Sequence, residues 1–177
     1  MKTKDIVSIS LFTTLLAVCA WIYIPMTIPF TMQTFAVFLA MFVLGGKKGT
    51  IVIFIYLITG LIGVPVFSGG TAGPAILLGP TGGYMIGWLF LGIICHWYEK
   101  VTDKFDKKPE IKLQILLLLA GMLVCYSFGT FWFTNIYTKE SSSFLAAFSV
   151  CVLPFIIPDV VKLALAYTVS KRIKKYI

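Results

Sequence analysis

Residues 153–167 read LPFIIPDVVKLALAY, an apolar segment that contains two prolines and two charges of opposite sign. The charges are Asp159 and Lys162, three positions apart, which places both side chains on one face of a helix. A charge at the centre of a bilayer costs at least about 2.5 to 3.5 kcal/mol, so an ionisable residue at that depth indicates a functional site. We predict that Asp159 and Lys162 face a cavity and bind a polar ligand; the alternative is a structural ion pair that only neutralises itself.

The prolines favour the binding interpretation. Pro154 and Pro158 each lack a backbone N–H, and each pushes the residue before it away from helical angles. Because proline suits the first position of a helix, the sequence predicts a last span over residues 144–170 that breaks at PFIIP and restarts near Pro158. Asp159 would then lie in the first turn, near the positive end of the helix dipole. Transporters place binding sites at such broken helices.

The composition excludes an ordinary soluble domain. Of the 177 residues, 59% are hydrophobic and 12% are charged, and the mean hydropathy is +0.95. At about 20 residues per span, this length holds six spans with short connections. We therefore predict an all-α, multi-pass protein of the cell membrane in which residues 1–177 form a single six-helix transmembrane domain. The expected helices cover about 5–24, 34–44, 50–62, 83–97, 111–133 and 144–170.

The positive charges predict the orientation of the chain in the lipid bilayer. Two basic residues lie near the N terminus, two in the turn 45–49, five in the connection 99–112 and four in the C-terminal tail. The other side of the membrane would carry only Lys139. By the positive-inside rule both termini are cytoplasmic, and the uncharged connections 25–34 and 68–82 face outward, where they can cover the charged pair. Because the basic residues adjoin apolar segments, the net charge of +8 does not indicate a nucleic-acid partner.

Two further polar residues are candidates for ligand binding. Gln33 lies in the first uncharged connection and offers two donors and an acceptor; its alternatives are helix capping and solvation at the lipid interface. Tyr84 follows the glycine-rich connection, and its alternative is an ordinary interface tyrosine. In the first helix, Thr13 and Ala17 are small residues four apart, which suits either packing inside the bundle or docking of another transmembrane helix.

Several other classes of site are not indicated. The four cysteines lie in apolar runs without CxxC spacing, and the single His96 lies at the expected end of a span, so we predict no metal site. No GxxxxGK[ST] motif is present, so the sequence indicates no ATPase site. No nucleophile accompanies the buried acid, and we predict neither a cofactor nor an enzyme activity.

Four segments, in order and in spacing, resemble the BioY family of biotin-specific S components of energy-coupling factor (ECF) transporters. They are PFTMQTFAVFLAMFVLGGKKG (29–49), GVPVF (63–67), GPTGGYMIGWLFLG (79–92) and LPFIIPDVVKLALA (153–166). The resemblance spans nearly the whole chain. It implies six helices, outward loops that close over biotin, and a first helix that docks on a transmembrane coupling subunit driven by two separate ATPase subunits.

On this resemblance, Asp159 and Lys162 match the P-D-x-x-K pair that meets the polar end of biotin, with Gln33 and Tyr84 as further binding residues. Thr13 and Ala17 match the docking face of the first helix, where alanine is commoner than Thr13. A glycine that often precedes the acid is replaced by Pro158. We predict high-affinity biotin capture for import; the alternative is a stand-alone, proton-coupled transporter that uses Asp159 as its proton site.

Overall fold

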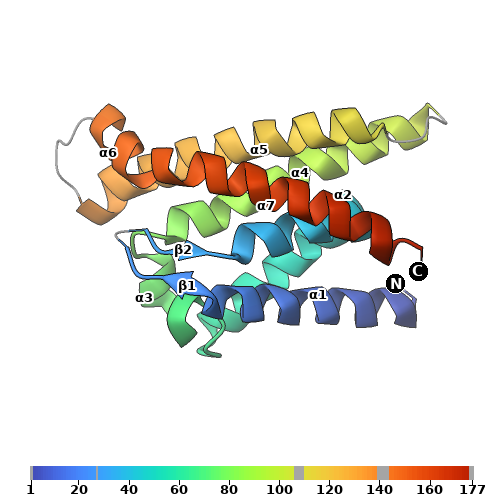
Figure 1. Cartoon of the computed structure of the whole chain (residues 1–177). Helices are drawn as coiled ribbons and strands as arrows, with labels where there is room; N and C mark the ends of the chain where they lie inside the picture. The colour runs from blue at the N-terminus through green and yellow to red at the C-terminus, as the bar shows by residue number, and fades with distance from the viewer. Residues whose placement is uncertain (1, 27, 106–109, 139–143, 176–177) are drawn as a thin grey trace.

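A computed structural model describes residues 2–26, 28–105, 110–138 and 144–175 as a bundle of roughly parallel and antiparallel helices (Figure 1). The elements in chain order are α1 (Thr3–Trp21), β1 (Tyr23–Ile24), β2 (Phe30–Thr31), α2 (Gln33–Leu61), the 3-10 turn η1 (Ser68–Gly70), α3 (Pro74–Leu77), α4 (Gly82–Lys104), α5 (Ile111–Trp132), the π-helical turn η2 (Phe133–Thr138), α6 (Phe144–Cys151) and α7 (Leu153–Ile173). The predicted all-α architecture is present, with one two-stranded hairpin added to it.

Helix α2 consists of two arms joined at Gly45. Gly45 has φ 83° and ψ 172°, a backbone conformation that is open to glycine and strained for other residues. The chain reverses there, so that Gln33 in the first arm donates a hydrogen bond to the Tyr56 hydroxyl in the second. The two arms, residues 33–44 and 46–61, correspond to the two separate helices that the sequence predicts.

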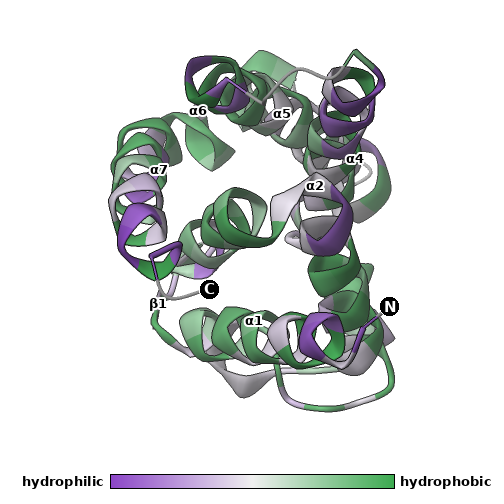
Figure 2. Cartoon of the chain, turned by 90° about the vertical axis from the view of Figure 1, so that its right-hand side faces the viewer, coloured by the Kyte–Doolittle hydropathy of each residue, from purple (hydrophilic) through white to green (hydrophobic). Residues whose placement is uncertain are grey.

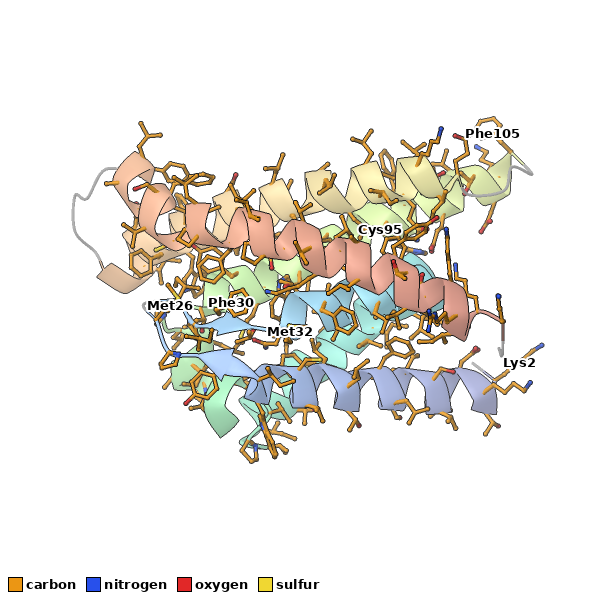
Figure 3. All side chains as sticks on the ribbon, viewed as in Figure 1. Lys2, Met26, Phe30, Met32, Cys95 and Phe105 are labelled. Carbon is orange, nitrogen blue, oxygen red and sulfur yellow. The ribbon has the colours of Figure 1, made fainter. Side chains whose placement is uncertain are left out.

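The first uncharged connection forms a short antiparallel hairpin. Tyr23 pairs with Thr31 and Ile24 with Phe30. The hairpin lies at the opposite end of the bundle from the two chain termini (Figure 1), as the labelled Phe30 and Lys2 also show (Figure 3). The glycine-rich connection reaches the same end, where it contains η1 and α3. Both connections therefore fold back over the bundle, as predicted, although the sequence did not indicate the strands.

The last span is interrupted at a different place from the one predicted. The interruption lies at Val152, with φ −123° and ψ −47°, between α6 and α7. Pro154 occupies the first turn of α7, where its missing N–H has no intrahelical partner to lose. Pro158 lies inside the helix, which continues through it. Asp159 is therefore one turn further from the start of α7 than predicted, and the helix dipole is not its main stabilising partner.

Helix α4 is longer than predicted, and it packs closely on α5. The sequence predicts an end near Trp97, whereas α4 continues to Lys104. Glu99, in this extension, accepts the backbone N–H of Gly46 at 2.6 Å, which caps the second arm of α2. Glycines permit the close contact with α5: a Cβ at Gly129 would overlap the Tyr84 ring. This packing holds Tyr84 against α5.

Four helices of the described residues, α1, α2, α5 with its π-helical extension, and α7, are long and apolar enough to cross a membrane. Most of the ribbon has the colour of hydrophobic residues, and hydrophilic stretches lie at the end that carries both termini (Figure 2). A buried hydrophobic cluster fills the interior, and Leu16, Phe38, Ile53, Leu91 and Leu118 are among its fully enclosed members. Many large hydrophobic side chains are exposed as well, Leu11, Leu116 and Ile157 among them, which suits a surface that faces lipid.

Candidate functional site

The predicted pair of charges lies inside the bundle. The Lys162 ammonium donates a hydrogen bond to Asp159 Oδ1 at 2.8 Å, and the two residues are 4% and 5% exposed. Their spacing on α7 places both side chains on one buried face of the helix, as predicted. Ions removed from water at this depth need further polar partners, because one partner alone does not compensate the loss of hydration.

The Asp159 carboxylate has two such partners from other helices. Thr34 of α2 donates to Oδ1 at 2.8 Å, and Tyr126 of α5 donates to Oδ2 at 2.7 Å. With Lys162, three donors converge on one carboxylate. Hydrogen bonds to an ionised acceptor are shorter and about twice as strong as neutral ones. Asp159 thereby connects α7 to α2 and α5.

The Lys162 ammonium has an aromatic neighbour on the hairpin. It lies 4.1 Å from the centroid of the Phe30 ring, within the range of a cation–π interaction. Phe30 also stacks on Phe155 of α7, with centroids 6.2 Å apart. Strand β2 is thus held over the charged pair by an aromatic residue, and the remaining donor capacity of Lys162 is available to a ligand.

Gln33 belongs to a second polar network beneath the hairpin. Its carbonyl oxygen accepts hydrogen bonds from Thr31 at 2.8 Å and Ser68 at 3.2 Å, and its amide nitrogen donates to the Tyr56 hydroxyl at 2.7 Å. Tyr56 in turn donates to the Val66 carbonyl. Gln33 is buried, which excludes the lipid-interface alternative. It connects both uncharged connections to α2.

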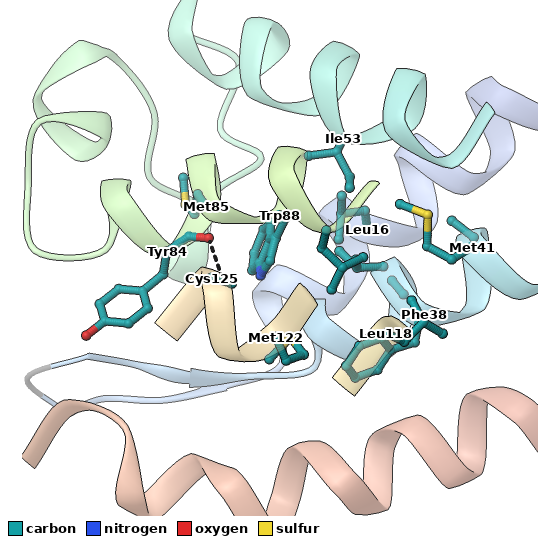
Figure 4. Packing of buried hydrophobic residues seen from close by; sticks show 14 of the residues in the cluster. Leu16, Phe38, Met41, Ile53, Tyr84, Met85, Trp88, Leu118, Met122 and Cys125 are labelled. Carbon is teal, nitrogen blue, oxygen red and sulfur yellow. Dashed lines mark hydrogen bonds between the residues drawn. The ribbon is translucent and has the colours of Figure 1, made fainter. Parts of the chain in front are cut away.

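Tyr84 is also buried, which excludes its role as an ordinary interface residue. Its hydroxyl lies 3.2 Å from the Thr130 hydroxyl of α5, and either atom can be the donor. The Cys125 thiol donates to the Tyr84 carbonyl, and Trp88 and Met122 pack nearby (Figure 4). Tyr84 is therefore fixed between α4 and α5.

These residues surround one cavity of about 60 Å3, which we name the ligand cavity. All four predicted binding residues line it: Gln33, Tyr84, Asp159 and Lys162. Its other walls are mostly apolar or aromatic, and they come from the hairpin, α2, α4, α5, α6 and α7 (Pro29, Met85, Trp88, Met122, Cys151 and Phe155 among them). An apolar enclosure with a few converging polar groups is the usual composition of a small-molecule site.

Sequence reasoning missed two residues that contact the acid directly. Thr34 is adjacent to the predicted Gln33, but a threonine at the start of an apolar run carries no distinctive signal. Tyr126 lies well inside the predicted fifth helix, away from both ends, where an interface tyrosine is not expected. Its position in the middle of an apolar span is the feature of the sequence that could have indicated a buried polar role for Tyr126. Its partner Asp159 is 33 residues away in the sequence.

The predicted docking residues lie away from the ligand cavity. Thr13 and Ala17 are partly buried on α1, and Ala17 packs against the hydrophobic cluster. The Thr13 hydroxyl donates to the Ile9 carbonyl within the helix. The two residues lie at the border between the packed and the exposed faces of α1, whose exposed members include Leu11 and Val18.

Nothing in the described ranges suggests a metal centre. No three His, Cys, Asp or Glu side chains come together there in a way that could hold an ion. Cys19, Cys95, Cys125 and Cys151 are all free and buried, as expected for small apolar residues. The polar chemistry of the cavity is therefore that of hydrogen bonds and one ion pair.

A helical bundle with a cavity that contains a buried ion pair defines a class, the membrane proteins that bind a small solute within their spans. The particular family follows from comparison: the model of the BioY family matches residues 1–177, and the chain belongs to that family. It is 38% identical over 175 residues to a probable biotin transporter BioY of Pyrococcus horikoshii, covering 98% of both chains. It is 34% identical over 173 residues to the biotin transporter BioY of Thermotoga maritima, covering 97% of this chain and 96% of the relative.

A solved structure agrees with this assignment. The fold matches a crystal structure of the S-component for biotin from an ECF-type ABC transporter with a TM-score of 0.83. The two are 26% identical, and the match covers 99% of this chain and 95% of the other. The predicted family is confirmed, and the chain is a multi-pass membrane protein whose relatives are transporters rather than enzymes.

Proposed function

We propose that this protein captures biotin with high affinity and mediates its uptake as the substrate-binding S component of an ECF-type, ATP-driven transporter. The observation that carries the proposal is the buried pair of Asp159 and Lys162 on the wall of the ligand cavity, in a chain that belongs to the BioY family. A purely structural role explains the presence of this ion pair poorly, because replacing a buried ion pair with apolar residues is often neutral or stabilising.

The ligand cavity matches the chemistry of biotin in three respects. Asp159 accepts N–H donors, and Lys162 donates to a carbonyl or carboxylate oxygen. Gln33 and Tyr84 add two further polar side chains to the cavity wall. Trp88 and the other apolar walls cover the hydrocarbon part of the ligand.

Binding requires movement of the hairpin. The ligand cavity has a volume of about 60 Å3, whereas pockets that bind small organic molecules usually measure roughly 300 to 1,000 Å3. The cavity must therefore widen before such a molecule can enter. At this point the hairpin contacts the bundle through the Phe30 ring and through the Gln33 network. The hairpin and the connection that holds η1 open outward, admit biotin and close over it.

The same proposal includes the arrangement in the membrane. Residues 1–177 form one domain with six spans: α1, each arm of α2, α4, α5, and α6 together with α7. Both termini lie on the cytoplasmic side with the basic residues, and the hairpin faces outward. Thr13 and Ala17 on α1 contact a transmembrane coupling subunit, and two separate ATPase subunits supply the energy. The absence of a GxxxxGK[ST] motif from the sequence is consistent with that division of labour.

The proposal is tested by titrating the purified protein with biotin in the absence of nucleotide. The expected result is saturable binding that is lost in Asp159→Asn and in Lys162→Ala while both variants remain folded. An unchanged affinity for biotin in both variants would show that Asp159 and Lys162 do not form the biotin site. Uptake by vesicles that contain the protein alone, abolished when the proton gradient collapses, would favour the proton-coupled transporter instead.

A further inference from the structure

A second cavity of about 190 Å3 lies between the first arm of α2, α5 and α7. We name it the lateral cavity. Phe38 lines it from α2, Leu119 and Leu123 from α5, and Ile156 and Val160 from α7. All five are apolar, and the four on α5 and α7 have at least a third of their surface exposed. In a multi-pass membrane protein, such exposed apolar residues face the lipid, so the lateral cavity is continuous with the lipid-facing surface.

The two cavities share a thin wall. Met122, Tyr126 and Asp159 line both of them. Within the described residues α5 packs along α4, whereas α5 and α7 approach each other little. The hydrogen bond from Tyr126 to Asp159, 2.7 Å long, crosses the gap between α5 and α7 at this point. The Tyr126 hydroxyl and the Asp159 carboxylate thus bond to each other, and the rest of the wall of the lateral cavity is apolar.

We propose that the lateral cavity is a binding site for hydrocarbon and takes one acyl chain of a bilayer lipid. Water is a poor occupant, because a buried water needs two to four polar partners. An unfilled space would deprive the lining side chains of dispersion contacts. In lipid, van der Waals packing of this kind governs association between apolar surfaces. One turn of a transmembrane helix, about 10 Å wide and 5.4 Å long, exceeds the volume of the lateral cavity, so a helix does not fit inside it.

The bound chain has a consequence for the ligand cavity. Only the shared wall separates the charged pair from the lipid on this side. An acyl chain in the lateral cavity completes the apolar packing behind Tyr126 and Asp159, so that their hydrogen bond stays dry. This site is distinct from the proposed biotin site, and it does not depend on which solute the ligand cavity binds.

The test uses a phosphatidylcholine that carries a photoreactive diazirine in the middle of one acyl chain. The full chain is reconstituted in vesicles that contain this lipid and irradiated, and the cross-linked residues are mapped by peptide mass spectrometry. The expected result is an excess of cross-links at Leu119. Val160→Trp, which fills the lateral cavity, reduces them to the background measured elsewhere on α5. Val161→Trp is the matched control at the same depth, since Val160 and Val161 are 50% and 52% exposed but only Val160 lines the cavity.

A second pair of variants covers the case in which Val160→Trp does not fold. Leu123 lines the lateral cavity and Leu116 does not, although both lie on α5 and each is 61% exposed. Leu123→Trp is expected to remove the cross-links and Leu116→Trp to retain them. Cross-links spread evenly over α5 and α7, or unaffected by either filling variant, would overturn the proposal. Loss of the cross-links on addition of saturating biotin would assign the lateral cavity to the solute and would overturn it as well.

Discussion

Removal of the charged pair one member at a time, and then together, separates its contribution to stability from its contribution to binding. Lys162→Met deletes the ammonium and leaves the Asp159 carboxylate with Thr34 and Tyr126 as donors. Asp159→Leu deletes the carboxylate and leaves the Lys162 ammonium with Phe30 as its remaining aromatic partner. The double variant removes both charges and keeps similar side-chain volumes.

The magnitudes follow from the partners that remain. Breaking a buried ion pair by removing one member costs about 3 to 5 kcal/mol of unfolding free energy. We expect Lys162→Met near the lower value, because two hydroxyl donors still solvate the carboxylate, and Asp159→Leu near the upper value. In the double variant only the hydroxyls of Thr34 and Tyr126 lose an acceptor, so we expect a cost of about 1 to 3 kcal/mol. Both charges take part in the proposed site, so biotin affinity falls by about 100-fold or more in all three variants.

The assay combines reversible unfolding in mixed micelles, followed by circular dichroism, with equilibrium binding of radiolabelled biotin. The expected pattern is a double variant that is more stable than Asp159→Leu and binds biotin about 100-fold or more weakly than wild type. A double variant less stable than either single variant would refute the reasoning about the ion pair. Wild-type affinity in the double variant would refute its role in binding.

Three other substitutions test separate parts of the structure. Tyr126→Phe removes one donor from the Asp159 carboxylate, so biotin affinity measured by calorimetric titration should fall about five- to tenfold; an unchanged affinity would make that donor dispensable. Phe30→Leu removes the ring over the Lys162 ammonium, and the dissociation rate of biotin, followed by isotope exchange, should rise about three- to tenfold. An unaltered rate would argue against the hairpin as a cover. Gly129→Leu introduces a side chain where α4 contacts α5, and it should lower the unfolding free energy by about 1 to 3 kcal/mol in the same micelle assay; wild-type stability would contradict the close packing.

The helices and the charged pair were accessible from the sequence because their signals are local. Long apolar runs predict helices, and the two glycines at 45 and 46 mark the reversal that the structure places at Gly45. Asp159 and Lys162 stood out because charge is rare in apolar spans. Gln33 and Tyr84 are candidates because they border uncharged connections; both line the ligand cavity, and their part in binding stays a prediction.

The position of the break in the last span was not accessible in the same way. Both prolines can begin a helix, so the sequence alone does not select between them. The structure uses Pro154 in the first turn of α7 and accommodates Pro158 inside it. The choice depends on packing: it turns Asp159 toward Thr34 and Tyr126, which the sequence separates from it by 125 and 33 residues.

The hairpin and the extension of α4 were missed for related reasons. Strands of two residues lack a periodic pattern, and β1 and β2 form where the uncharged connection folds back over the cavity. The hydrophilic residues after Trp97 indicated a connection, yet Lys and Glu are good helix formers and α4 continues through them. Glu99 then finds its partner, Gly46, on another helix.

The most direct test of the central claim is a structure of the protein crystallised with biotin. We predict biotin in the ligand cavity, with polar atoms within about 3.2 Å of Lys162 Nζ and of an Asp159 oxygen, and with Phe30 closed over it. Biotin bound at another place, with the ion pair of Asp159 and Lys162 untouched and the ligand cavity unchanged, would contradict it.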